Sequence, residues 1–90
     1  MTEILSTIEY DILNAVYFVE PFENILSECN EKEPVVADVL KQLIHKKYIV
    51  PMKWDETKSE FIRSFIYDSD DMRAYHYLAT KEGLMVHTTK

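Results

Sequence analysis

The residue types that carry out chemistry in proteins are sparse in this chain of 90 residues. There is one cysteine, Cys29, and there are three histidines, His45, His76 and His87. No histidine lies three or four residues from another histidine or from the cysteine, which is the spacing that places two metal ligands on one face of a helix. The sequence therefore predicts no metal site and no cofactor.

Residues 68–71 form an acidic run that is similar in composition to the start of a calcium loop. Such a loop needs a glycine at its sixth position and a glutamate at its twelfth, where this chain has Arg73 and Ala79. We therefore expect a solvated turn. Cys29 stands at an apolar helical position with no basic residue before it in the predicted helix, so we interpret it as a buried structural residue. Without a nucleophile paired to a base, the sequence predicts that the protein is not an enzyme.

The charge is unevenly distributed along the chain, whose formal net charge is −6. Residues 1–31 carry −7, residues 32–53 carry +3 and residues 54–90 carry −2. One interpretation is an acidic surface that aids solubility. The other is a dipolar module whose basic middle faces an acidic partner, or whose acidic front faces a basic one.

The composition narrows the class of protein. Apolar residues make up 47% of the chain and charged residues 29%, which is ordinary globular usage, so we expect a single domain over residues 1–90. The sequence has no run of eighteen apolar residues, so it predicts no membrane span, and residues 1–5 do not resemble a signal peptide. A single cysteine suits a reducing compartment, and we expect a cytoplasmic location. The single glycine, Gly83, excludes a glycine-rich phosphate loop.

The apolar spacing predicts three helices in the first half of the chain. The first begins at Ser6, which has the capping-box spacing to Glu9, and it is stopped by Pro21. Its apolar stripe consists of Ile8, Ile12, Ala15, Val16 and Val19. The second covers residues 22–29. The third begins near residue 35, is about thirteen residues long, and has lysines near its negative end.

After the third helix the apolar period changes to two. Residues 48–54 predict a strand, which should lie at a sheet edge or pair on one side only at Pro51. Residues 61–67 predict a strand because β-branched and aromatic residues dominate, although their spacing also permits a helix. Residues 55–58 and 68–71 predict turns. Residues 73–78 predict a third strand, and Thr80 is expected to cap a short last helix with Leu84 and Met85 on its apolar side.

This order predicts an α+β fold with a three-helix core, a small antiparallel sheet that covers the core with one face, and a short C-terminal helix. On a strand over 61–67, one face carries Phe61, Phe65 and Tyr67 and the other carries Ile62 and Ile66. Because both faces are apolar, we expect a second copy or a protein partner to cover the outer one.

Several stretches resemble winged helix-turn-helix proteins. Residues 34–43 (PVVADVLKQL), with the continuation KYIV at 47–50, are similar to the third helix and first wing strand of that family. Residues 75–83 (YHYLATKEG) resemble the segment that ends the wing and starts a following helix, and residues 12–17 and 22–26 resemble the first two helices. The resemblance covers nearly the whole chain. It implies a winged-helix fold whose third helix enters the major groove of DNA.

The resemblance implies a small DNA-binding transcriptional regulator, and two functions remain open. The first is binding to duplex DNA, for which the candidate residues are Lys41, Gln42, Lys46, Lys47 and Lys53. The exposed start of the third helix has Val35, Ala37 and Asp38, which lack the paired hydrogen-bonding groups that read bases. The alternative is a protein-interaction or dimerisation module that does not bind DNA, with a homodimer or another protein as partner. Its candidate contact residues are Trp54, Phe61, Phe65 and Tyr67.

Overall fold

The computed structural model describes residues 5–88 of the chain. These residues form four α-helices and one antiparallel sheet of four strands, which confirms the α+β prediction. The helices are α1 (Thr7–Ala15), α2 (Phe22–Glu28), α3 (Glu33–His45) and α4 (Lys81–Thr88), with a 3-10 turn η1 (Met72–Ala74). The strands are β1 (Glu20–Pro21), β2 (Ile49–Asp55), β3 (Glu60–Arg63) and β4 (His76–Ala79).

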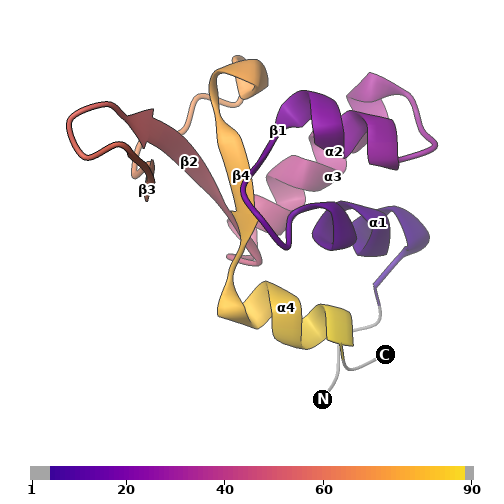
Figure 1. Ribbon diagram of the computed structural model, residues 1–90. Coiled ribbons are helices and arrows are strands. Elements are labelled where there is room, and N and C mark those ends of the chain that lie inside the picture. The colour runs from indigo at the N-terminus through magenta and orange to yellow at the C-terminus, as the bar shows by residue number, and fades with distance from the viewer. Residues whose placement is uncertain (1–4, 89–90) are drawn as a thin grey trace.

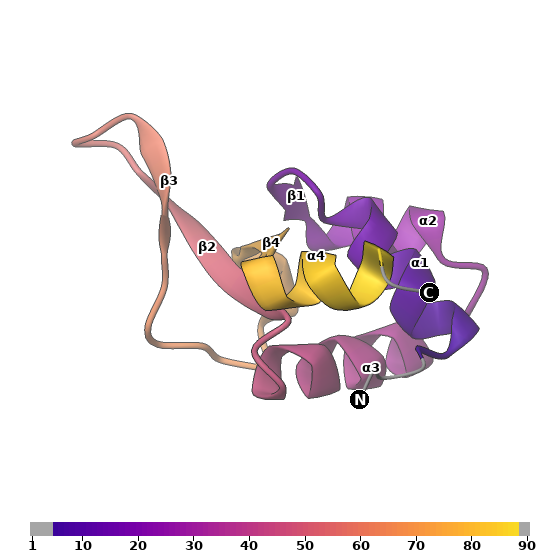
Figure 2. The same ribbon diagram turned by 90° about the horizontal axis from the view of Figure 1, so that it is seen from below.

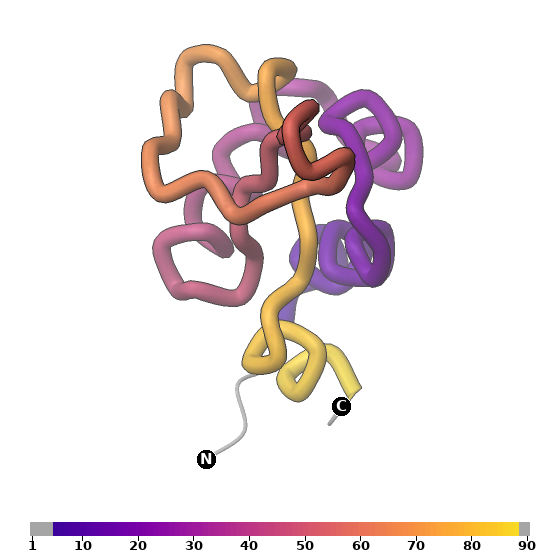
Figure 3. The backbone as a smooth tube through the Cα atoms, turned by 60° about the vertical axis from the view of Figure 1, so that its left-hand side comes forward, coloured from indigo at the N-terminus to yellow at the C-terminus, as the bar shows by residue number. Residues whose placement is uncertain are grey.

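One part of the sheet packs on the helical core, and the other part projects from it as a hairpin. Its strand order is β1-β4-β2-β3, and every neighbouring pair is antiparallel. Helices α1, α2 and α3 lie together on one side of the sheet, and α4 follows β4 at the sheet's end (Figure 1). The β2–β3 hairpin extends away from all four helices (Figure 2), which is consistent with overall dimensions of 40 × 27 × 19 Å. Figure 3 shows the backbone from the side on which the hairpin projects.

The core is one continuous cluster of side chains from the helices and the sheet. Helix α3 contributes Val36, Leu40 and Leu43, whose spacing of four and three residues places them on one helix face. The other large, fully buried side chains are Ile12, Leu13, Val16, Phe22, Ile25, Ile49 and Tyr77. Burial of each such apolar side chain contributes about 1.5–3 kcal/mol, so the helices are held by packing on the sheet.

The capping box at the first helix is confirmed, but the helix is shorter than predicted. The Glu9 amide donates to Ser6 Oγ, and the Ser6 amide donates to the Glu9 carboxylate. The helix ends at Ala15 rather than before Pro21. Its end is set by the sheet, because the Val16 carbonyl accepts the Ala79 amide of β4 at 2.9 Å. The chain then forms the short edge strand β1, which the sequence did not predict.

Helix α3 ends in a Schellman motif. Lys47 has a φ of 67°, in the left-handed region that favours glycine. The Tyr48 amide donates to the Leu43 carbonyl, and the Lys47 amide donates to the Ile44 carbonyl. This reversal directs the chain from α3 into β2. The residue range of α3 matches the predicted length of thirteen residues.

The strands agree with the prediction only in part. Strand β2 lies inside the sheet and not at an edge, although at Pro51 its register partner is in β4 alone. Residues 60–63 form a strand and exclude the helical alternative, but the strand ends at Arg63 and not at residue 67. It ends there because the chain bends, with the Ser64 hydroxyl donating to the Ile66 carbonyl at 2.6 Å.

The segment before β4 and the buried side of α4 both differ from the prediction. Residues 72–74 form a 3-10 turn because Arg73 is drawn to the helices, so the last strand begins at His76. Thr80 caps α4 as predicted, accepting the Gly83 amide at 3.0 Å. However, α4 buries Gly83 and His87, and Met85 is exposed. This follows from the close approach of the helix backbone to the turn after α3.

Candidate functional site

The outward face of α3 carries two of the five residues predicted to contact DNA. Lys41 and Gln42 are exposed on it, whereas Lys46 and Lys47 lie in the turn that follows, and Lys53 lies on β2. The same helix face presents Asp38, whose carboxylate accepts a hydrogen bond from the Gln42 side-chain Nε2 at 3.2 Å. An acidic group therefore interrupts the basic face of α3. It also occupies the side chain of Gln42, which would have to be free to read a base.

Lys46 is paired within the chain. Its Nζ lies 3.4 Å from the Glu9 carboxylate of α1, and both side chains are partly shielded, with 39% and 14% exposed. Burial opposes ionisation of Glu9, but hydrogen bonds from the amide and hydroxyl of Ser6 and the charge of Lys46 together lower its pKa below the usual value of 4.5. The ion pair joins the start of α1 to the end of α3.

Arg73 holds the start of α3 to α2, a role that the sequence did not predict. Its guanidinium makes two hydrogen bonds with the Glu33 carboxylate, at 2.9 and 2.7 Å, and also contacts Glu23. It lies over the Phe22 ring at 5.1 Å. The hydrogen bonds from Arg73 lower the pKa of the Glu33 carboxyl. No spacing signal marks Arg73, because its two acidic partners are 50 and 40 residues away in the sequence.

The tip of the hairpin carries an aromatic pair. Trp54 and Phe61 are directly opposed across β2 and β3, and their rings meet edge to face at 5.1 Å. Phe61 also contacts the His76 ring of β4 at 4.5 Å. These side chains lie on the sheet face away from the helical core, because Tyr77 and Ile49, on the alternate residues of β4 and β2, face the core.

Large apolar side chains are exposed on the hairpin and just after its end. Trp54 is 52% exposed, Phe65 is 89% exposed and Ile66 is 82% exposed. Ile62 adds a further 37% from the opposite side of β3. We refer to Trp54, Ile62, Phe65 and Ile66 as the hairpin surface. Half of the exposed large hydrophobic residues found among residues 5–88 belong to it.

Of the four residues predicted to contact a protein partner, Tyr67 does not lie on the exposed side of the hairpin. It packs against the core, with its ring 4.9 Å from Tyr75, and its hydroxyl lies 3.2 Å from that of Tyr77. Tyr77 in turn donates to the Met72 carbonyl at 2.8 Å. Phe65 and Tyr67 do not share a strand face, because β3 ends before them. Tyr67 therefore anchors the segment after the hairpin, and Ile62 and Ile66 take the exposed positions.

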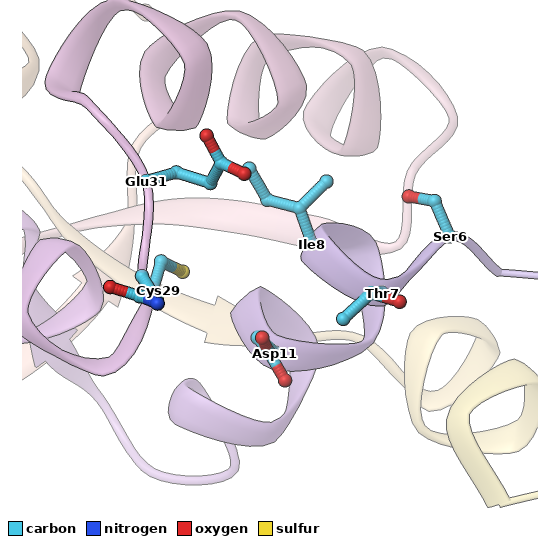
Figure 4. A pocket seen from close by; sticks show the side chains of 7 residues that line it. Ser6, Thr7, Ile8, Asp11, Cys29 and Glu31 are labelled. Carbon is cyan, nitrogen blue, oxygen red and sulfur yellow. The ribbon is translucent and has the colours of Figure 1, made fainter.

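A pocket of about 350 Å³ lies between the start of α1 and the turn after α2. Figure 4 shows Cys29 at this pocket together with Asp11 and Glu31. Burial, followed by the nearby carboxylates of Asp11, Glu28 and Glu31, raises the pKa of the Cys29 thiol to about 11. The thiol is thus protonated at neutral pH, which is the state of a buried structural cysteine and not of a nucleophile.

Two structural features are absent from the described part of the chain. Within residues 5–88, no group of three or more His, Cys, Asp or Glu side chains is placed to hold a metal ion. In the same range, no helix combines the length and apolar character needed to cross a membrane. Among known proteins, no family model, no curated protein and no solved structure matches the chain.

Proposed function

We propose that the chain is a protein-docking domain of the winged-helix type, which acts by binding and uses the β2–β3 hairpin as its wing. The order of elements supports this type, because three helices precede the hairpin and a short helix ends the described chain. In this proposal residues 1–90 are one domain. The reduced, buried thiol of Cys29 supports a cytoplasmic location.

The observation that carries the docking role is the hairpin surface. A structural wing that only covers a core does not need large apolar side chains on its outside, yet Phe65 and Ile66 are more than four-fifths exposed. Exposed apolar side chains of this size mark interaction sites on small proteins, and aromatic residues are enriched in interface cores. Because the hairpin projects from the helices (Figure 2), a partner reaches it without contacting the acidic first half of the chain.

The charges around α3 favour a protein partner over DNA. Lys46 is paired with Glu9, Asp38 lies on the exposed helix face, and Glu33 stands at the helix start. Carboxylates at these positions would approach DNA phosphates with the same sign of charge. The predicted contacts of Lys41, Gln42, Lys46, Lys47 and Lys53 with duplex DNA thus remain a prediction, which the following experiment tests directly.

The first experiment is a titration of the full chain against random duplex DNA at two salt concentrations. We expect no measurable binding at low salt. If four lysines neutralised phosphates, the affinity would instead fall with a slope of about −3.6 in log–log form. In that case the combined change of Lys46→Ala and Lys47→Ala would weaken binding to all sequences alike, and the preference for a protein partner over DNA would be wrong.

The second experiment places a photoreactive benzoylphenylalanine at Phe65 and, as a matched control, at Phe18. Both side chains are strongly exposed, at 89% and 78%, but Phe18 lies in the loop after α1. We expect a discrete protein adduct from position 65 in the cells that make the protein, and none from position 18. Equal labelling at both positions would contradict a specific hairpin surface.

A further inference from the structure

We propose that the partner of the hairpin surface is a second copy of this chain, which adds its own β3 to the free edge of β3 in an antiparallel, two-fold symmetric pairing. This inference rests on the proposed docking function and names its occupant. It follows from the hydrogen-bonding pattern of the edge, from its symmetry, and from the charges and exposed apolar side chains around it.

The outer edge of β3 has unpaired backbone groups. Strand β3 is the last strand in the sheet order, and no strand in residues 5–88 pairs with its outer side. The Ser64 amide donates to the Pro51 carbonyl at 2.9 Å, at the position where the β2–β3 register continues. The N–H and C=O groups of successive residues in a strand point to opposite sides. The backbone groups of Ile62, like those of Ser64, therefore point toward β2, and those of Phe61 and Arg63 point outward. Such an edge is a template for another strand.

The outward groups define a self-complementary register. Two antiparallel copies of β3 can pair around an axis through Ile62, perpendicular to the sheet. In this register Phe61 exchanges two backbone hydrogen bonds with the partner's Arg63, and Arg63 does the same with the partner's Phe61. Ile62 meets the partner's Ile62 as a non-hydrogen-bonded pair, where side chains approach most closely.

The side chains suit this register. Opposed residues share a sheet face, so each Phe61 ring meets the partner's guanidinium, a favourable cation–aromatic contact. Arg63 already makes a contact of this kind with Phe65, at 5.4 Å. The only charged side chains of residues 49–63 are three basic and three acidic: Lys53, Lys58, Arg63, Asp55, Glu56 and Glu60. This segment is therefore neutral, whereas residues 1–31 carry −7 and would repel a second copy.

Exposed apolar side chains flank the pairing edge. Ile62, on the axis, is 37% exposed, and Phe65 and Ile66, which follow the end of β3, are 89% and 82% exposed. A second copy at this edge removes part of that apolar surface from water. Trp54 lies one strand further in, on β2, so it stays outside the pairing.

Sedimentation equilibrium of the full chain tests the pairing. We expect a reversible dimer at micromolar concentration. Ile62→Lys places two like charges at the axis and should raise the dissociation constant at least about 100-fold. Val35→Lys is the matched control, because Val35 is similarly exposed, at 42% against 37% for Ile62, but lies on α3. It should leave the dimer unchanged.

A charge-swap experiment tests the register itself. Ile62→Lys and Ile62→Glu chains should each be monomeric, and an equimolar mixture should restore a dimer, because residue 62 meets its own counterpart. In the unaltered protein, hydrogen exchange of the Phe61 and Arg63 amides should slow as concentration rises, while the Ile62 amide stays unchanged. This second measurement does not depend on whether a variant folds.

The outcomes separate this inference from the docking proposal. A chain that stays monomeric to about 1 mM, or a dimer that Ile62→Lys leaves intact, would overturn the self-pairing. A crosslink at position 65 to a different protein would overturn it as well but would leave the docking function standing. No crosslink there, together with salt-dependent DNA binding, would overturn both.

Discussion

The substitution Gly83→Ala sets two well-understood effects against each other. Alanine is the better helix former, and in an exposed helix this exchange stabilises by about 1 kcal/mol. In α4, however, a Cβ at position 83 would lie 2.1 Å from the Tyr48 carbonyl oxygen. Ordinary contact begins near 3.4 Å, so the helix or the turn must move by more than 1 Å. The atom in the way is backbone, and it accepts the Thr80 amide at 2.9 Å, so it cannot rotate aside.

The expected net effect of Gly83→Ala is a loss of stability. Overpacking against a fixed group costs up to about 3 kcal/mol, and subtracting the helix propensity leaves a loss of about 2 kcal/mol. For a chain of this size that lowers the melting temperature by about 8–16 °C. Met85→Ala, at an exposed position of the same helix, should change the free energy of unfolding by less than about 0.5 kcal/mol. A Gly83→Ala protein that melts at or above the parent temperature would refute the close packing of α4 on the turn after α3.

Three other predictions concern the turn after α3, the thiol and the first helix. Lys47→Gly should raise the free energy of unfolding by about 1 kcal/mol in urea denaturation, because position 47 has a φ of 67°, and a loss would contradict the Schellman motif. Cys29 should react with iodoacetamide near pH 8 much more slowly in the folded protein than in urea, because burial and nearby carboxylates raise the pKa of its thiol to about 11, and equal rates would contradict this. The pKa of Glu9 is lower in the folded protein than in the unfolded chain. Its contribution to the free energy of unfolding is therefore complete above the unfolded-state pKa of about 4.5 and is lost as pH falls through the folded-state pKa. Thermal melts between about pH 3 and 7 should show a shallower loss for Glu9→Gln, and an unchanged slope would exclude Glu9 as a source.

The sequence predicted the features that depend on local spacing. The capping box at Ser6, the thirteen-residue α3 and the cap at Thr80 are all present, and the strand predicted over residues 48–54 is found at 49–55. Each is set by contacts within a few residues, or by a period that one buried face imposes. The α+β class is also predicted correctly, because three amphipathic helices share an apolar face that a sheet must cover.

The features that the sequence did not predict depend on contacts between distant residues. Strand β1 is two residues long and exists because β4 passes beside it. Arg73 leaves the strand pattern because Glu23 and Glu33 draw it to the helices. The prediction that Phe65 and Tyr67 share a strand face is also wrong, because the chain bends at Ser64 and the alternation does not continue past it. In each case the deciding partner lies too far along the chain to leave a periodic signal.

Residues of the hairpin surface can be replaced without destabilising the core, and the docking proposal can therefore be tested by substitution. Apolar groups stabilise a fold in proportion to the area that folding removes from water, and Phe65 and Ile66 remain almost wholly in water. Replacing them with polar residues should therefore cost little of the free energy of unfolding. Tyr67 is the opposite case, because it is joined to Tyr77 and packed on the core. An exposed group that contributes little to folding is explained by what it contacts outside the chain, and the unpaired edge of β3 lies directly beside it.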